Sequence, residues 1–176
     1  MKKKCSNATL SILVDTARDE YAKERERTTT LDNKASFFIT VIVAVVTISI
    51  PIIPFSSFVN ILNDGTVINI HLVSFFINGL IASFICLICS FAYLYKAYKV
   101  ADFRSINLDC VNEEYQKESI EYIQKNLCKS YKEIVAHNKT INDEKADSVS
   151  NGIRLGLIGF IVLIVCTIAL IITIGG

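Results

Sequence analysis

Charged residues are missing from long stretches of this 176-residue sequence. No Lys, Arg, Asp or Glu occurs between Lys34 and Asp64, and none occurs from Leu155 to the C-terminus. Apolar residues make up 52% of the chain and charged residues 20%, and nearly all of the charge falls in residues 1–34 and 96–154. A soluble domain distributes charge along its whole length, so this alternation of charged and apolar blocks predicts an integral membrane protein.

Histidine is also scarce, with only His71 and His137 in the chain. The sequence contains no Ser-His-acid set, no phosphate-binding loop and no metal-ligand spacing. Cys86 and Cys89 have the C-x-x-C spacing of redox and metal sites, but they lie inside an apolar segment without nearby charge, which favours small buried side chains. We therefore predict that the protein is not an enzyme, and we expect no cofactor and no metal.

Three apolar blocks are long enough to cross a bilayer as helices, at about residues 35–54, 72–95 and 152–176. A run of about 20 residues covers a hydrocarbon core of about 30 Å at a rise of about 1.5 Å per residue. Each block must be helical because the bilayer core has no water to satisfy exposed backbone groups. The predicted fold is therefore all-α, with three transmembrane helices.

All eighteen Lys and Arg residues fall on one side of the predicted membrane. The positive-inside rule then places both charged parts of the chain in the cytoplasm and the C-terminus outside. The predicted organisation is an N-terminal cytoplasmic amphipathic helix with a hinge (1–34), a transmembrane helical hairpin (35–101), a cytoplasmic helical segment (102–151) and a third transmembrane helix (152–176).

The N-terminal part has the periodicity of an amphipathic helix. Apolar residues recur at three- and four-residue steps from Leu10 to Tyr21. Further along, the Thr28–Thr30 run and Asp32 offer N-cap groups for a new helix that enters the membrane. We therefore expect a hinge near these residues.

The segment between the second and third spans contains no Pro or Gly from Lys96 to Asn151. One apolar stripe predicts a helix over about 110–142, formed by Ile120, Ile123, Leu127, Tyr131, Ile134 and Ile141. The acidic residues Asp143, Glu144 and Asp147 are expected on a solvated face. A single helix with one apolar stripe must bury it, either against the N-terminal helix or against another copy of the chain.

Small residues in the spans favour self-association, because they allow helices to approach closely in a membrane. They are Gly152, Gly156 and Gly159 in the third span, and the pairs Gly79/Ser83 and Ala82/Cys86 in the second. We expect a homo-oligomer, with a tetramer as the expected size.

Polar residues within the spans are candidates for a pore lining, namely Thr40, Thr47, Asn78 and Ser83. The alternative is hydrogen bonding within or between helices, which is favoured for the hydroxyl groups because Ser and Thr bond to their own helix. Basic residues next to the spans would surround a cytoplasmic mouth in an oligomer, namely Lys96, Lys99, Arg104 and Arg154. The alternative for these is ordinary anchoring at the membrane surface.

Two stretches resemble small bacterial membrane effectors of anti-phage nucleotide-signalling systems. They are "TTLDNKASFF", where Asp32, Lys34 and Ala35 open the first span, and "AHNKTINDEKADSVSNGIRLGLIGF", where Asn138, Asn142 and Lys145 precede the last span. The chain is similar to effectors of the SLATT type and to transmembrane effectors of Pycsar-like systems, and by size and helix order it is most similar to the Hailong membrane effector.

This resemblance implies a homo-oligomeric channel in the bacterial inner membrane that stops phage growth by permeabilising the cell. A nucleotidyltransferase would supply a nucleotide or a short single-stranded oligonucleotide, for which oligodeoxyadenylate is one candidate, and this signal would gate the channel through its cytoplasmic helices. Guanidinium and ammonium groups suit phosphates, so the candidate ligand contacts are Arg18, Lys23, Arg25, Arg27 and Lys34.

Two alternatives remain open at this point. The chain could be a membrane anchor or immunity-type protein that docks a soluble partner without conducting ions. It could also be a holin-like protein that forms lesions without any ligand. Toxicity on expression would separate the anchor from both pore-forming classes.

Overall fold

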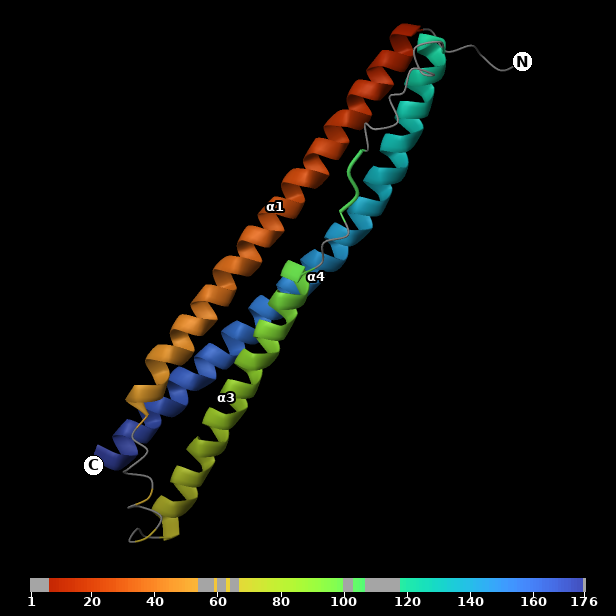
Figure 1. Ribbon diagram of the computed structural model, residues 1–176. Helices are drawn as coiled ribbons and strands as arrows, with labels where there is room; N and C mark the ends of the chain where they lie inside the picture. The colour runs from red at the N-terminus through yellow and green to blue at the C-terminus, as the bar shows by residue number, and fades with distance from the viewer. Residues whose placement is uncertain are drawn as a thin grey trace. The chain divides into compact units, whose positions relative to one another are not determined.

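The computed structural model describes residues 7–53, 59, 63, 67–99, 103–106 and 118–175. It contains the helices α1 (Asn7–Ile52), α3 (Val67–Lys99) and α4 (Ile120–Gly175), shown in Figure 1. All three helices are long and apolar enough to cross a membrane. The prediction of an all-α protein with three membrane-length helices is thus confirmed for the described part of the chain.

Helix α1 is one unbroken helix of 46 residues. Thr28 and Thr29, expected to cap a new helix, instead lie inside α1, where their hydroxyls donate to the carbonyls of Glu24 and Arg25 at 3.0 and 3.2 Å. A Thr that bonds to the carbonyl four residues earlier remains compatible with a continuing helix. The expected helix start at Thr28–Thr30 is therefore wrong, because these hydroxyls satisfy carbonyls of α1 and do not satisfy new N–H donors.

Helix α4 is also a single helix, of 56 residues, where the sequence predicted two separate ones. It begins after Ser119, whose carbonyl and Oγ accept the Tyr122 amide at 3.0 and 3.3 Å, as an N-cap residue does. Residues 110–117 of the expected helix lie outside the described residues. Gly152 does not interrupt α4 even though Gly is a poor helix former, because it packs against Leu94 and Ser90 of α3.

The described helices belong to two compact units. The polar unit comprises Met1–Asp32 and Val100–Ala146, and the apolar unit comprises Asn33–Lys99 and Asp147–Gly176.

In the polar unit, α1 and α4 pack as a parallel pair. Contacts between the two helices follow the same order along both of them, from Tyr21–Tyr131 through Thr28–Asn142 to Asp32–Lys145. The most buried residues of α4 in this unit are Asn138, Asn142 and Lys145, at steps of four and three residues. Such spacing is that of coiled-coil packing, but here the positions that usually hold apolar residues are polar.

In the apolar unit, α3 and α4 form a close antiparallel pair. Ser83 Oγ donates to the Gly159 carbonyl at 2.7 Å, and Ser90 Oγ donates to the Gly152 carbonyl. A Cβ added at Gly159 would lie 3.1 Å from both the Ser83 carbonyl and Cys86 Cβ, so a larger residue there would require α3 to move by a few tenths of an ångström. α3 also buries Val73, Leu80, Leu87 and Leu94, each seven residues after the last, as a coiled-coil helix does.

The glycines expected to favour self-association therefore make their close helix contacts within one chain. Gly152, Gly156 and Gly159 all face α3, and Gly79 of α3 faces Cys166 of α4. These residues no longer support an oligomer, because their close approach is already satisfied by the antiparallel pair. Self-association itself stays a prediction.

Helix α1 packs more loosely than α3 and α4 in the apolar unit. Of its most apolar residues only 11% are buried within the chain, against 22% for each of the other two helices. The apolar unit has two grooves along α1, and Ile42 and Leu87 line both of them. The α1–α4 groove is lined by Phe38, Val41, Ile42, Val45, Leu87, Ser90, Ile153, Gly156, Leu157 and Phe160, and the α1–α3 groove by Ile42, Val43, Val46, Thr47, Phe84, Leu87, Ile88 and Phe91.

Candidate functional site: a buried polar seam

The most unusual feature of the polar unit is a set of buried and half-buried polar side chains on α1 and α4, which we call the polar seam. It consists of Asn138, Asn142 and Lys145 on α4 and Glu24, Thr28 and Asp32 on α1. Asn138 and Asn142 are completely buried, and Lys145 is 3% exposed. Burying such groups is unfavourable unless each one finds a partner, so their partners decide what the seam does.

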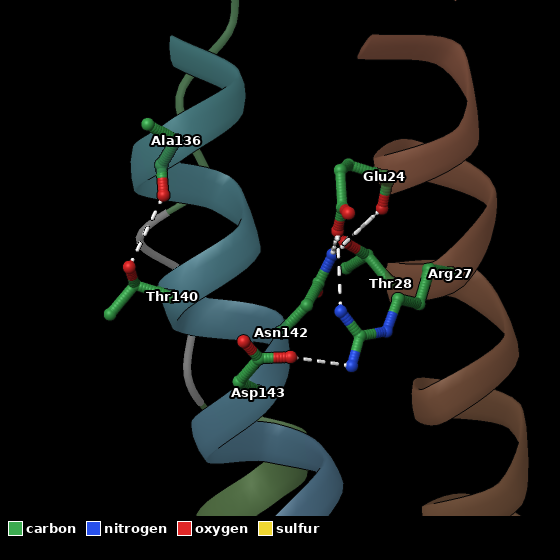
Figure 2. A network of polar contacts seen from close by, with 7 residues as sticks. All are labelled: Glu24, Arg27, Thr28, Ala136, Thr140, Asn142 and Asp143. Atoms are coloured by element: carbon green, nitrogen blue, oxygen red, sulfur yellow. Dashed lines mark hydrogen bonds and ion pairs between the residues drawn. The ribbon is translucent and has the colours of Figure 1, made fainter. Parts of the chain in front are cut away.

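Both the nitrogen and the oxygen of the Asn142 side-chain amide form hydrogen bonds to α1, as Figure 2 shows. Its Nδ2 donates to the Glu24 carbonyl and to Glu24 Oε2, both at 2.8 Å, while its Oδ1 accepts from Thr28 Oγ1 at 2.8 Å. The Thr28 hydroxyl has one proton, so it serves either Asn142 or the Glu24 carbonyl at any moment. A buried Asn at a core position of a parallel helix pair fixes the register of the pair at some cost in stability.

Three ion pairs flank this amide. Arg27 Nη2 lies 2.7 Å from Asp143 Oδ1, and its Nη1 lies 3.7 Å from Glu24 Oε2. One turn further along α1, Asp32 Oδ1 lies 2.7 Å from Lys145 Nζ. The Lys145 side chain is 3% exposed and the Asp32 side chain 33% exposed, so the ammonium depends on this carboxylate far more than the carboxylate depends on the ammonium.

Asn138 attaches the segment of residues 103–106 to α4. Its Oδ1 accepts the Arg104 amide at 2.9 Å, and its Nδ2 donates to the Arg104 carbonyl at 3.0 Å. Next to this contact, the ring of Tyr21 lies 5.9 Å from the rings of both Phe103 and Tyr131, a spacing at which aromatic pairs attract. The polar unit is thus held by specific hydrogen bonds and by one aromatic cluster.

Of the five predicted ligand contacts, the structure places only Arg27 next to the polar seam. Arg27 is half-buried and already paired with carboxylates, whereas Arg18 and Arg25 are exposed. Lys23 is exposed and forms an ion pair with Glu20 at 2.7 Å. Lys34 is exposed and belongs to the apolar unit.

The sequence analysis singled out Asp32, Asn138, Asn142 and Lys145 through the resemblance. It did not predict that these residues meet, because polar residues on a helix normally indicate a solvated face. The available signal was a matching pattern in two helices. Asn138, Asn142 and Lys145 share one face of α4, while Thr28 and Asp32 share one face of α1, so both helices offer polar groups where they meet. Asp143, Glu144 and Asp147 are exposed, as expected of a solvated face.

The predicted pore-lining residues fall into two groups. Thr40, Thr47 and Asn78 are exposed and donate to carbonyls of their own helix, those of Ser36, Val43 and Ser74. Ser83 is completely buried between α3 and α4, where it donates to Gly159. Within this chain, Ser83 therefore forms a hydrogen bond between helices, which is the alternative to a pore lining that the sequence favoured for hydroxyl groups.

The basic residues predicted at a cytoplasmic mouth are exposed. Lys96, Lys99 and Arg154 belong to the apolar unit, and Arg104 belongs to the polar unit, where only its main chain bonds to Asn138.

Among the described residues, no group of three or more His, Cys, Asp or Glu side chains is placed to hold a metal ion. Comparison with protein-family models, with curated proteins and with solved structures gives no match to this chain.

Proposed function

We propose that the chain is a homo-oligomeric ion channel of the bacterial inner membrane, an anti-phage effector gated through its cytoplasmic helices by a nucleotide or short oligonucleotide. One observation carries this proposal. α1 and α4 each continue as a single helix from the polar unit into the apolar unit. If α1 and α4 change their pairing in the polar unit, the change therefore affects two helices that also form the apolar unit.

The polar seam suits a switch better than it suits a permanent clamp. Replacing a buried network of ions and amides by apolar residues is often neutral or stabilising, so such a network is weak evidence for selection on stability. Its hydrogen bonds and ion pairs can instead be exchanged for contacts with water or with an anion. Two arrangements of similar free energy are what a gating element requires.

Arg27 is the point at which an anionic signal would act on the seam. Its guanidinium is occupied by Asp143 at 2.7 Å, and a phosphate group binds guanidinium in the same geometry as a carboxylate. A phosphate that displaced Asp143 would separate α1 from α4 at this position. The exposed Arg18 and Arg25 would hold further phosphates of an oligonucleotide.

The pore itself requires several copies of the chain. Thr40 and Thr47 lie seven residues apart on one face of α1 and are exposed, as is Asn78 on α3. In an oligomer these faces would line the conducting pathway, and their groups would offer hydrogen bonds to water.

Ion flux from liposomes that contain the purified chain tests this proposal. We expect flux that changes on addition of short oligodeoxyadenylate, and a weaker response in the variant Arg18→Gln/Arg25→Gln/Arg27→Gln. The matched control is Lys125→Gln/Lys129→Gln/Lys132→Gln, which removes three exposed cations from α4.

Each negative result has a definite meaning. Absence of flux in all conditions would support the anchor class of protein. Flux that no nucleotide changes, whether deoxyadenylate, deoxythymidylate or a cyclic nucleotide, would support the holin-like class. An equal loss of response in both triple variants would exclude a specific role for the α1 arginines.

A further inference from the structure

The α1–α4 groove of the apolar unit is partly open and has an almost entirely apolar lining. Phe38, Val41 and Val45 of α1 and Ile153, Leu157 and Phe160 of α4 form its walls. It encloses about 160 Å³, far more than one water molecule needs, but a buried water also requires two or more polar partners.

The groove offers no such partners. Its single side-chain hydroxyl, that of Ser90, already donates to the Gly152 carbonyl. The remaining lining side chains are apolar. The occupant that fits is therefore a hydrocarbon chain, because it needs no hydrogen bond and gains contacts that an empty groove would lack.

The charges next to this groove point to the kind of hydrocarbon. Lys34 lies four residues before Phe38 on α1, and Arg154 lies three residues before Leu157 on α4, so both cations are about one helical turn from the lining. Both side chains are exposed, and neither forms an ion pair with any described residue. Long basic side chains at this depth extend toward lipid headgroups.

We propose that the α1–α4 groove binds an anionic phospholipid, with an acyl chain between α1 and α4 and the phosphate at Lys34 and Arg154. This site does not depend on the channel function, because it requires only that the apolar unit lies in a bilayer. It gives the loosely packed α1 a lipid as its neighbour in place of a protein helix. Membrane composition would then set how firmly α1 is held.

The test uses the purified full chain in a non-ionic detergent, with native mass spectrometry to count retained lipid. We expect more retained phosphatidylglycerol than phosphatidylcholine of the same acyl chains. Each basic residue near an anionic headgroup contributes roughly fivefold in relative retention, so Lys34→Gln/Arg154→Gln should abolish the preference. The control Lys96→Gln/Lys99→Gln removes two other basic residues at the end of α3 and should keep it.

A second pair of variants tests the groove itself. Val45→Phe places a ring in the α1–α4 groove and should reduce retention of both lipids, whereas Val43→Phe places the same ring in the α1–α3 groove and should not. Val41→Phe replaces Val45→Phe if circular dichroism shows that the latter loses helix.

Several results would overturn the site. They are equal retention of the two lipids by the wild-type chain, equal loss of preference in both double variants, and unchanged retention in the groove-filling variants. A change in subunit number in Val45→Phe without loss of lipid would show that a second copy of the chain occupies the groove.

Discussion

At the scale of single residues, the polar seam separates groups that depend on a partner from groups that water can satisfy. The Asn142 amide is completely buried and uses Thr28 and Glu24 as partners, so each removed partner leaves a buried group unsatisfied. The Thr29 hydroxyl, one residue further along α1, is exposed and bonds only to Arg25 of its own helix. Neighbouring residues of the same type therefore have different roles.

We predict that Thr28→Val lowers the free energy of unfolding by about 1–3 kcal/mol, because Asn142 Oδ1 loses its donor in a buried site. Thr29→Val is the matched control and should change it by less than about 0.5 kcal/mol. The double variant Thr28→Val/Asn142→Leu should recover the whole loss and be more stable than the wild-type chain, since apolar packing then replaces the buried polar pair. Thermal unfolding in detergent, followed by circular dichroism, measures all three, and equal effects of the two single variants would contradict the seam.

The Asp32–Lys145 pair gives a second prediction, based on its unequal burial. Asp32→Asn should destabilise the chain by about 3 kcal/mol, because it leaves the buried Lys145 ammonium without its counter-charge. Lys145→Met should cost about 1 kcal/mol or less, because water can reach the Asp32 carboxylate. The same unfolding measurement checks the order of the two variants, and the reverse order would show that Lys145 is hydrated.

At the scale of helices, the sequence predicted which segments are helical better than it predicted where the helices begin and end. Absence of charge over whole blocks was enough to predict three membrane-length helices, because only a helix satisfies its backbone in a bilayer. The continuity of α1 through Thr28 could not be predicted, since Thr is equally suited to capping and to bonding backwards. Predicting the polar seam would have required knowing that two segments more than 100 residues apart pair with each other. The pattern of residues within one helix does not give this information.

The α3–α4 pair provides a prediction about glycine. A methyl group added at Gly79 would contact Cys166 Sγ, which lies at the end of a side chain, whereas one added at Gly159 would meet the Ser83 carbonyl and Cys86 Cβ at 3.1 Å. We expect Gly159→Ala to destabilise the pair more than Gly79→Ala. Adding Cys166→Ala should rescue Gly79→Ala and leave Gly159→Ala unchanged.

Thermal unfolding of these variants in one detergent tests this difference. If Cys166→Ala rescued both glycine variants equally, the contact of Gly159 with the backbone of α3 would not limit the approach of the helices.

At the scale of the whole molecule, two of the three helices take part in both units. Among the described residues, the hydrogen bonds between helices that involve charged groups lie in the polar unit, and the close backbone contacts lie in the apolar unit. A ligand that acts on the first can affect the second through α1 and α4, which are continuous between them.

This arrangement predicts opposite effects of two seam variants on gating. Thr28→Val/Asn142→Leu favours the paired helices and Asp32→Asn weakens them, so the concentration of oligodeoxyadenylate that gives half of the flux response should shift in opposite directions. The measurement is the liposome flux assay described above, with Thr29→Val as the control. A shift in the same direction for both variants would separate gating from the pairing of α1 and α4.

Two serine hydroxyls of α3, those of Ser83 and Ser90, have a mechanical consequence for the membrane part. Ser83 and Ser90 bind carbonyls of Gly159 and Gly152, so any sliding of α3 along α4 would break both bonds at once in a medium that offers no replacement. We therefore expect the α3–α4 pair to move as one rigid body, and we expect a gating movement within a bilayer to fall to α1, the helix that packs more loosely in the apolar unit.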